Sequence, residues 1–461
     1  MPKASGRFQT GYSCPVRPDS RPRVRFLLAL GIVSAGAALF AVAFRSLLAL
    51  VYARVYHAAN VVEAMAMLPP WLRIAVPVAG GAVAGLLARL RPSQGVSNVM
   101  EAVALGNVRL SLRTTLFRVT SSGIAIATGM SIGREGPLIE FGGSLGAALA
   151  RRLRTTLVQT RVLVASGTAA GFASAYNTPF AAILFVFETI LGVAAPAALL
   201  PVMTAAVIGT SVTRAIVGSG PIYGQRAFPS QSPIELVLFA LLGVLAAVAA
   251  AGFKRILQIF ETAFEHRPLG QPWRSTLGGL VVGLLILGLP EVAGNGYEPL
   301  NLLLDQRMML TTVSLLLVGK VLATSASVGS GVPGGIFTPM LLLGASLGTL
   351  VAHALSLVLP LPLVAGSFEL VGMAATTAAS IHAPLTAAVL VFELSGDYAI
   401  VLPLLLSTTV ATLMSRLMGS MSIYEAELRR RGVAWQLTLE GRRVIRSEQP
   451  SASAADTAPR G

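Results

Sequence analysis

Long apolar runs separated by short polar stretches fill the chain from residue 26 onward. The first run, 26–53, is too long for a signal-peptide core and shows no clear cleavage site, so it is expected to be a membrane helix. Further runs of membrane length, or somewhat less, follow it at about 72–90, 98–116, 136–150, 161–190, 195–217, 233–251, 275–289, 308–326, 336–359, 366–395 and 399–418. This pattern predicts an all-α integral membrane protein.

Glycine or proline interrupts many of these runs before they are long enough to cross a bilayer. A full crossing needs about 20 helical residues, yet the chain breaks at 177–179 (Asn-Thr-Pro) and at 382–384 (His-Ala-Pro). Helices that stop at membrane depth are tolerated where protein or a watery cavity covers their ends. Interrupted helices of this kind are typical of a transporter or channel.

Two stretches of the first half recur in the second half. Gly167–Glu188 aligns with Gly372–Glu393 at an offset of 372 − 167 = 205, with nine of 22 residues identical. Gly136–Ala147 aligns with Thr338–Thr349 at an offset of 338 − 136 = 202, with five of 12 identical. Two halves with interrupted segments in matching places predict a substrate site where the halves meet, near the membrane midplane.

A charged pair, Arg134 and Glu135, stands between apolar segments and is flanked by Gly133, Gly136 and Pro137. A charge at the bilayer centre costs roughly 3 kcal/mol on insertion scales, so such residues usually mark ion or proton pathways. Proline is well placed as the first residue of a new helix, whose bare N–H groups and dipole attract an anion. The alternative is a short surface loop with a solvated ion pair.

A second glycine-rich break, 329–339, precedes an apolar helix in the other half. It lacks the Gly-Lys-Ser/Thr ending of a nucleotide-binding loop. The N–H groups of Gly335, Ile336 and Phe337, ahead of Pro339, would form a second anion-facing helix start. The Phe337 ring is either a hydrophobic gate, which its position in the break favours, or a packing residue.

Glu188 and Glu393 each end an apolar run within the repeats. We interpret both as helix-end carboxylates bonded to backbone N–H groups, present twice because the halves are duplicated. His382 stands where the first repeat has Asn177. This correspondence favours a helix-capping or turn role for the histidine over a titrating one.

The composition supports the membrane assignment and sets the two ends apart. The 461 residues are 54% hydrophobic and only 12% charged, against about 25% charged in a soluble domain. Residues 1–25 carry six basic side chains and one acidic one, and the chain is basic again from Arg429. Basic flanks stay cytoplasmic, so both termini are expected there. The net charge of +15 is then attributed to topology and lipid headgroups rather than nucleic acid, which would need interleaved aromatics.

The sequence offers little for metal, thiol or enzyme chemistry. The single cysteine, Cys14, lies in the N-terminal tail, and the four histidines have no metal-ligand spacing. No nucleophile–base pair is visible at membrane depth, so no enzyme activity, cofactor or metal is expected. A cation carrier or a transporter of another substrate stays a different-class alternative. A cation carrier would need carboxylates at its site, and Glu135 is the only one placed there.

Five motifs, taken together and in order, resemble the CLC family of chloride channels and chloride/proton antiporters. They are GREGP at 133–137, GGIFTP at 334–339, NTPFAAILFVFE at 177–188, HAPLTAAVLVFELSGDY at 382–398 and Ile423-Tyr424 before a basic helix. The resemblance runs from about Ala84 to Arg431 and implies a CLC-type fold of two inverted repeats with tilted and broken helices. It also implies a homodimer in which each subunit has its own pore.

The expected organisation is a membrane domain between two basic ends. The segments are a disordered cytoplasmic tail at 1–25, the membrane domain at 26–428, its repeats at about 60–217 and 275–418, and a polar basic tail at 429–461. The short C-terminal tail leaves no room for the paired regulatory CBS domains of many relatives. The chain therefore resembles the prokaryotic type.

The resemblance implies roles for single residues. Glu135 matches the gating glutamate, whose carboxylate occupies the outer anion site and admits an anion when it swings away or takes up a proton. The N–H groups of Ile336 and Phe337 and the Tyr424 hydroxyl match groups that bind a central anion. The other positions assigned to the anion sites are Gln94, Gly95, Gly133, Arg134, Gly136 and Gly335.

Two positions depart from the family pattern. The family's Gly-Ser-Gly-Ile-Pro motif corresponds here to 93–97, with Gln94 at the anion-binding serine and Ser97 at the proline. A glutamine amide is longer and also carries an acceptor, which leaves the preferred anion open. Thr189 stands where proton-coupled members have a second glutamate as inner proton relay, and threonine does not titrate at ordinary pH.

The predicted function is transport of chloride, or a similar inorganic anion, through a plasma (inner) membrane pore gated by Glu135, as a voltage-gated-type channel. A chloride/proton antiporter and a variant selective for another anion are the alternatives. Glu135 serves as the gate and candidate proton acceptor in each, whereas Thr189 favours uncoupled flux. The predicted partners are the anion, the lipid bilayer, a second copy of the chain and, for an antiporter, protons.

Overall fold

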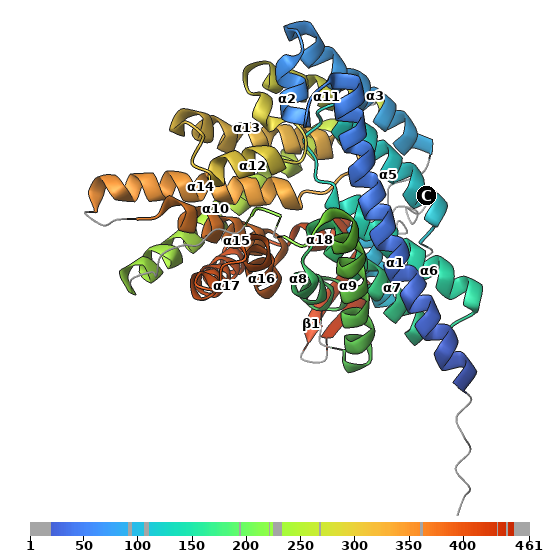
Figure 1. Cartoon of the computed structure of the whole chain (residues 1–461). Coiled ribbons are helices and arrows are strands. Elements are labelled where there is room, and N and C mark those ends of the chain that lie inside the picture. The colour runs from blue at the N-terminus through green and yellow to red at the C-terminus, as the bar shows by residue number, and fades with distance from the viewer. Residues whose placement is uncertain are drawn as a thin grey trace, which may run out of the picture.

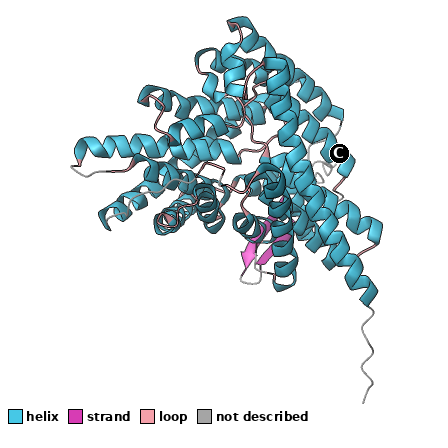
Figure 2. Cartoon of the chain, viewed as in Figure 1, coloured by secondary structure: helices cyan, strands magenta, loops and turns pink. Residues whose placement is uncertain are grey.

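The fold is almost entirely helical, and a two-stranded hairpin follows the last helix (Figure 2). The computed structural model describes residues 20–90, 95–105, 110–192, 195–220, 222–224, 233–266, 269–359, 363–430, 432–438 and 441–446. Within these ranges, six helical stretches are long and apolar enough to cross a membrane. The prediction of an all-α integral membrane protein is confirmed.

A long N-terminal helix leads into the first repeat (Figure 1). It begins at Ser20, ahead of the apolar run at Phe26, because arginine favours helices and a proline is tolerated in the first turn. The leading elements are α1 (Ser20–Val51), η1 (Tyr52–Tyr56) and α2 (Val61–Met67).

The two repeats use corresponding helices in the same order. The first repeat contains α3 (Pro70–Leu90), α4 (Val96–Leu105), α5 (Leu112–Ala127), α6 (Glu135–Leu153), α7 (Leu157–Tyr176), α8 (Pro179–Phe185), η2 (Val186–Leu191) and α9 (Pro196–Val217). After α10 (Pro233–Glu265), the second repeat contains α11 (Gln271–Gly288), η3 (Pro290–Val292), α12 (Tyr297–Leu304), α13 (Leu310–Gly329), α14 (Phe337–Val358), α15 (Ala365–Ile381), α16 (Pro384–Ser395) and α17 (Val401–Leu417). The chain then continues with α18 (Ile423–Arg430), β1 (Val433–Thr438) and β2 (Gly441–Arg446).

In each repeat, a pair of glycines lies where two corresponding helices cross and lets their backbones come into contact. α6 crosses α7 where Gly142 meets Gly167, and α14 crosses α15 where Gly344 meets Gly372. In both crossings, a Cβ on either glycine would collide with the carbonyl oxygen of the other. The offsets, 344 − 142 = 202 and 372 − 167 = 205, equal those of the sequence repeats. The sequence repeat therefore preserves the same close backbone contact between two helices in both halves of the protein.

The repeats meet through corresponding helices. α3 packs along α11, with Gly81 against the Ser275 backbone and Gly279 against the Pro77 backbone. α8 likewise packs against α16. In Figure 1, α5, α6 and α7 lie on the right and α14 and α17 on the left.

Several boundaries differ from the sequence expectation. The run predicted at 98–116 is two helices, α4 and α5, because the Ser111 side chain caps a new helix by accepting from the Thr114 N–H at 3.5 Å. α10 extends to Glu265 as a polar-faced helix. α12 has eight residues, too few to give a membrane-length run. The hairpin of β1 and β2 falls within the polar tail and was not expected there.

Candidate functional site

Two helix starts, one from each repeat, face each other at the centre of the molecule. α6 begins at Glu135 and α14 at Phe337. The segments just before the two helices are joined by an isolated antiparallel bridge. In it, the Gly133 N–H donates to the Gly335 carbonyl at 2.6 Å, and the Gly335 N–H donates to the Gly133 carbonyl at 2.8 Å. A Cβ at Gly335 would meet the Glu135 carboxylate, so only glycine permits this close approach.

The Glu135 carboxylate occupies the start of α14. Its Oε1 accepts from the Phe337 N–H at 2.7 Å and the Thr338 N–H at 3.2 Å, and its Oε2 accepts from the Thr338 hydroxyl at 3.2 Å. The side chain is 2% exposed, which excludes a solvated surface pair. Free N–H groups and the helix dipole make this position favourable for negative charge. The negative carboxylate therefore lies where the start of α14 favours negative charge.

A cavity of about 1750 Å³ reaches this carboxylate from one side. The predicted site residues among those that line it are Gly95, Glu135, Gly136, Gly335, Ile336 and Tyr424. The Tyr424 ring is buried and packs edge-on against Phe185, with ring centroids 6.5 Å apart. The structure thus brings residues of α6, of α18 and of the segment just before α14 to one cavity.

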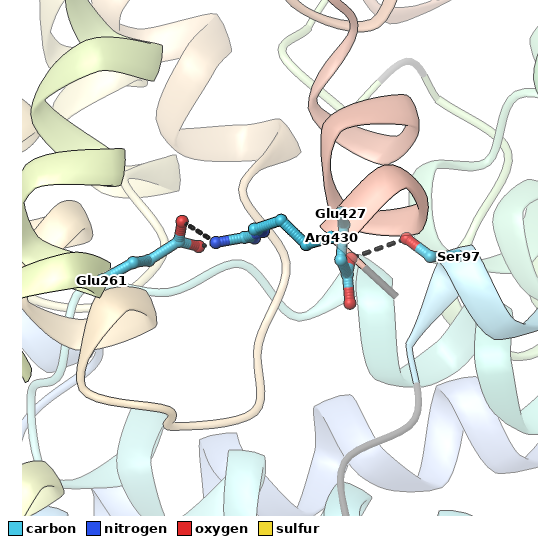
Figure 3. Close-up of polar contacts among 4 residues, drawn as sticks. All are labelled: Ser97, Glu261, Glu427 and Arg430. Carbon is cyan, nitrogen blue, oxygen red and sulfur yellow. Dashed lines mark hydrogen bonds and ion pairs between the residues drawn. The ribbon is translucent and has the colours of Figure 1, made fainter. Parts of the chain in front are cut away.

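Ion-pair and hydrogen-bond contacts cross the mouth of this cavity between α10, α18 and α4. The Arg430 guanidinium of α18 pairs with the Glu261 carboxylate of α10 (Figure 3). The Ser97 hydroxyl of α4 donates to Glu427 of α18 at 2.6 Å. These contacts join the helix that carries Tyr424 to both neighbouring elements.

Three predicted site residues, Arg134, Phe337 and Gly133, make packing or backbone contacts and are not among the residues that line the cavity. The Arg134 guanidinium lies over the Tyr297 ring, 5.6 Å from its centroid, while Glu135 bonds to α14 instead. The Phe337 ring packs edge-to-face on Phe172 at 5.6 Å, which supports the packing interpretation over the gate. Gly133 holds the bridge to Gly335.

Gln94, Thr189 and the N–H of Gly335 are the remaining predicted positions. Gln94 lies outside the described residues, whereas the adjoining Gly95 lines the cavity. Thr189 lies in η2 and is buried. The Gly335 N–H is engaged by Gly133, so the second N–H that reaches Glu135 comes from Thr338, which the sequence analysis did not single out.

The carboxylates that end the repeat motifs cap each other's helices. Glu188 accepts from the N–H groups of Leu385 at 3.1 Å and Thr386 at 2.7 Å, at the start of α16. Glu393 accepts from the N–H groups of Phe180 at 3.1 Å and Ala181 at 2.8 Å, at the start of α8. The interpretation of both as structural carboxylates bonded to N–H groups is confirmed. In each case the helix that the carboxylate caps belongs to the other repeat.

The turn role of the residues before these half-helices is also confirmed. Asn177 and His382 end α7 and α15 in the left-handed conformation, with φ of 57° for each. Asparagine tolerates this conformation. Proline then begins the next helix, where its missing N–H is not needed.

Sequence reasoning missed several buried charged side chains near the cavity. Lys254 of α10 donates to the carbonyls of Ala379 at 3.1 Å and Met421 at 3.0 Å, just ahead of α18. Arg118 of α5 forms an ion pair with Glu140 of α6, Nε to Oε2 at 3.5 Å. For Glu140 the available signal was an isolated charge inside the apolar run predicted at 136–150, whereas Arg118 and Lys254 lie just beyond the runs predicted at 98–116 and 233–251.

Paired repeats of broken helices, with a buried carboxylate held between two helix starts, define a membrane transport protein. The sequence profile described as voltage gated chloride channel matches residues 80–416. The chain belongs to this family, the CLC proteins, and has their fold of two inverted repeats.

Similar proteins extend over most of the chain. The chloride channel protein ClcB-like of Ralstonia nicotianae is 38% identical over 410 residues, 87% of this chain and 96% of that protein. The voltage-gated ClC-type chloride channel ClcB of Salmonella typhimurium is 33% identical over 379 residues, 79% of this chain and 89% of that protein.

Two solved structures have the same fold. A slow cyanobacterial Cl⁻/H⁺ antiporter matches with a TM-score of 0.80 at 26% identity, over 88% of this chain and 98% of that chain. A CLC-type fluoride/proton antiporter matches with a TM-score of 0.73 at 22% identity, over 86% of this chain and 97% of that chain. The second match concerns fold alone.

Proposed function

We propose that this protein carries chloride or a similar inorganic anion across the membrane through a pathway gated by Glu135. The observation that carries the proposal is the Glu135 carboxylate on the Phe337 and Thr338 N–H groups. A carboxylate and a halide compete for the same donors, so an anion passes when the carboxylate leaves or is protonated. The channel-type names of the curated relatives support transport of chloride.

The test is anion flux in liposomes that contain purified protein. Glu135→Ala removes the competing carboxylate while leaving the N–H groups, so halide flux is expected to stay at the wild-type rate or rise. Any proton movement should disappear, because alanine has no proton to exchange. A Glu135→Ala protein that is folded and passes neither halides nor nitrate would show that Glu135 is not the gate.

A second candidate is exchange of chloride for protons, in place of a channel. It is favoured by the cyanobacterial antiporter's similarity and by the buried Glu140 in the same cavity as Glu135. A chloride gradient across the liposome distinguishes the two. Proton movement against its own gradient indicates an exchanger, and current that reverses at the chloride Nernst potential without proton movement indicates a channel. Replacing chloride by nitrate, bromide or fluoride then defines the preferred anion.

The protein is further proposed to act in the plasma (inner) membrane with both ends on the cytoplasmic side, and without enzyme activity. The basic segments at both ends of the sequence support this topology. The cavity mouth, where Arg429 and Arg430 are exposed, would then open to the cytoplasm.

A homodimer is proposed on the basis of the exposed starts of α8 and α16. Phe180 is 63% and Leu385 48% exposed, beside the half-buried carboxylates of Glu188 and Glu393. Helix ends and charges at membrane depth require a covering of protein. A second copy of the chain would supply that covering.

A further inference from the structure

A second buried carboxylate shares the cavity of Glu135. Glu140 lies five residues further along α6 and is 1% exposed, and both glutamates line the cavity. An ionisable side chain at membrane depth is expensive and commonly serves the movement of ions or protons. The structural alternative is that Glu140 only neutralises Arg118.

The surroundings of Glu140 suit a group that both holds and releases a proton. The Arg118 Nε lies 3.5 Å from its Oε2, and the Thr115 hydroxyl donates to its Oε1 at 3.4 Å. Thr115 in turn shares a hydrogen bond of 2.7 Å with the Ser144 hydroxyl. The cation stabilises the ionised carboxylate, while hydroxyl groups act as both donors and acceptors.

Other carboxylates near the pathway have different positions. Glu261 and Glu427 lie at the cavity mouth, paired with Arg430 and Ser97 (Figure 3). Glu188, which neighbours Thr189 in sequence, is bonded to the start of α16. Among the described carboxylates that line the cavity, Glu140 is the one that shares α6 with Glu135.

We infer that Glu140 is the inner proton-exchange residue of this pathway, an inference that rests on the proposed function in its proton-exchanging form. Protonated Glu140 gives its proton to the Glu135 carboxylate through water, which a cavity of about 1750 Å³ can hold. One O–H bond breaks on Glu140 and one forms on Glu135. Neutral Glu135 no longer competes for the α14 N–H groups, and ionised Glu140, stabilised by Arg118, is reprotonated from the cavity mouth.

The experiment records chloride and pH together on liposomes that contain the full chain. Wild-type protein is expected to move protons against their gradient when chloride runs down its own. In Glu140→Gln, the number of protons moved per chloride is expected to fall about 100-fold or to the background level, while chloride still passes when the Glu135 carboxylate swings away from α14. Glu140→Asp, which keeps a carboxylate, should retain part of the proton movement. Glu265→Gln is the matched control, an exposed carboxylate at the cavity mouth, and should behave as wild type.

The outcomes separate this inference from the proposed function. If wild-type protein moves chloride but no protons, or if Glu140→Gln keeps the wild-type proton-to-chloride ratio, Glu140 has no relay role although the anion pathway stands. If wild-type protein moves no anion, the proposed function itself is wrong. Should Glu140→Gln misfold because Arg118 loses its ion pair with this residue, the double variant Arg118→Gln/Glu140→Gln removes both charges. Proton movement at the wild-type ratio in that variant would equally overturn the inference.

Discussion

At the residue scale, the same contact occurs three times: a glutamate carboxylate accepts hydrogen bonds from the first N–H groups of a helix in the other repeat. Glu135 of the first repeat bonds to the start of α14 in the second repeat. Glu188 does the same at α16, and Glu393 returns the contact from the second repeat to α8. Each is favourable because bare N–H groups and a helix dipole attract negative charge. What distinguishes Glu135 is the cavity beside it, from which, under the proposed function, an anion would compete for the same donors.

The two structural carboxylates should stabilise the fold to a similar degree. Glu393→Gln and Glu188→Gln keep an acceptor oxygen but remove the charge at a helix start, so each is expected to lower the free energy of unfolding by about 1 kcal/mol. Thermal unfolding in detergent measures the change as a lower midpoint. The exposed Glu265→Gln on α10 should leave the midpoint unchanged. Unchanged midpoints for both capping variants would mean that these contacts add nothing to stability.

Backbone contact between helices is the main constraint at the element scale. The crossings of α6 with α7 and of α14 with α15 place glycine against glycine in both repeats. Helices in membranes gain most of their association energy from such close packing, because lipid is as apolar as the side chains. The half-helices depend on these crossings, since α6 and α14 carry the two helix starts of the site.

A single methyl group at a crossing should therefore be costly. Gly344→Ala places its Cβ against the Gly372 carbonyl and is expected to destabilise the protein by about 1–3 kcal/mol. Gly142→Ala in the first repeat should have a matching effect. The control is Gly252→Ala on α10, where a Cβ meets nothing within 4 Å, so a gain of up to about 1 kcal/mol is expected from helix propensity. Equal thermal midpoints for Gly344→Ala and Gly252→Ala would contradict the packing argument.

The whole molecule encloses its site between the repeats but leaves two half-helix starts near its surface. α8 and α16 pack against each other, and Phe180 and Leu385 project from their first turns. The cavity mouth, in contrast, is joined by the pair of Arg430 and Glu261 between α18 and α10. The exposed starts need a protein partner at membrane depth, whereas a polar mouth suits an aqueous side.

The surface at α8 and α16 should hold two copies together. Phe180→Ala removes a large exposed ring and is expected to weaken the dimer about tenfold, as truncation of an aromatic anchor does. Light scattering of the detergent-solubilised protein, over a range of concentrations, gives the mass. Leu315→Ala on α13, which is exposed on another helix, serves as control. A wild-type protein that remains a monomer at every concentration would exclude this surface as a dimer contact.

The sequence by itself determined the features that depend on short stretches of chain. Apolar runs identified the membrane helices, proline and glycine located the breaks, and the repeat offsets identified the duplication. The flanking glycines and Pro137 were enough to mark Glu135 as a charge at a helix start. Hydropathy and backbone propensity act over a few residues, so they can be read locally.

Only the tertiary structure decided which groups meet. Glu135 and Phe337 are 337 − 135 = 202 residues apart, and the bond between them exists because α6 and α14 are packed end to end across the repeat boundary. The same packing directs Arg134 to Tyr297 and brings Glu140 into the cavity that Glu135 lines. A contact between residues so far apart cannot be predicted from a short stretch of sequence, because the close packing of the whole fold determines which residues meet.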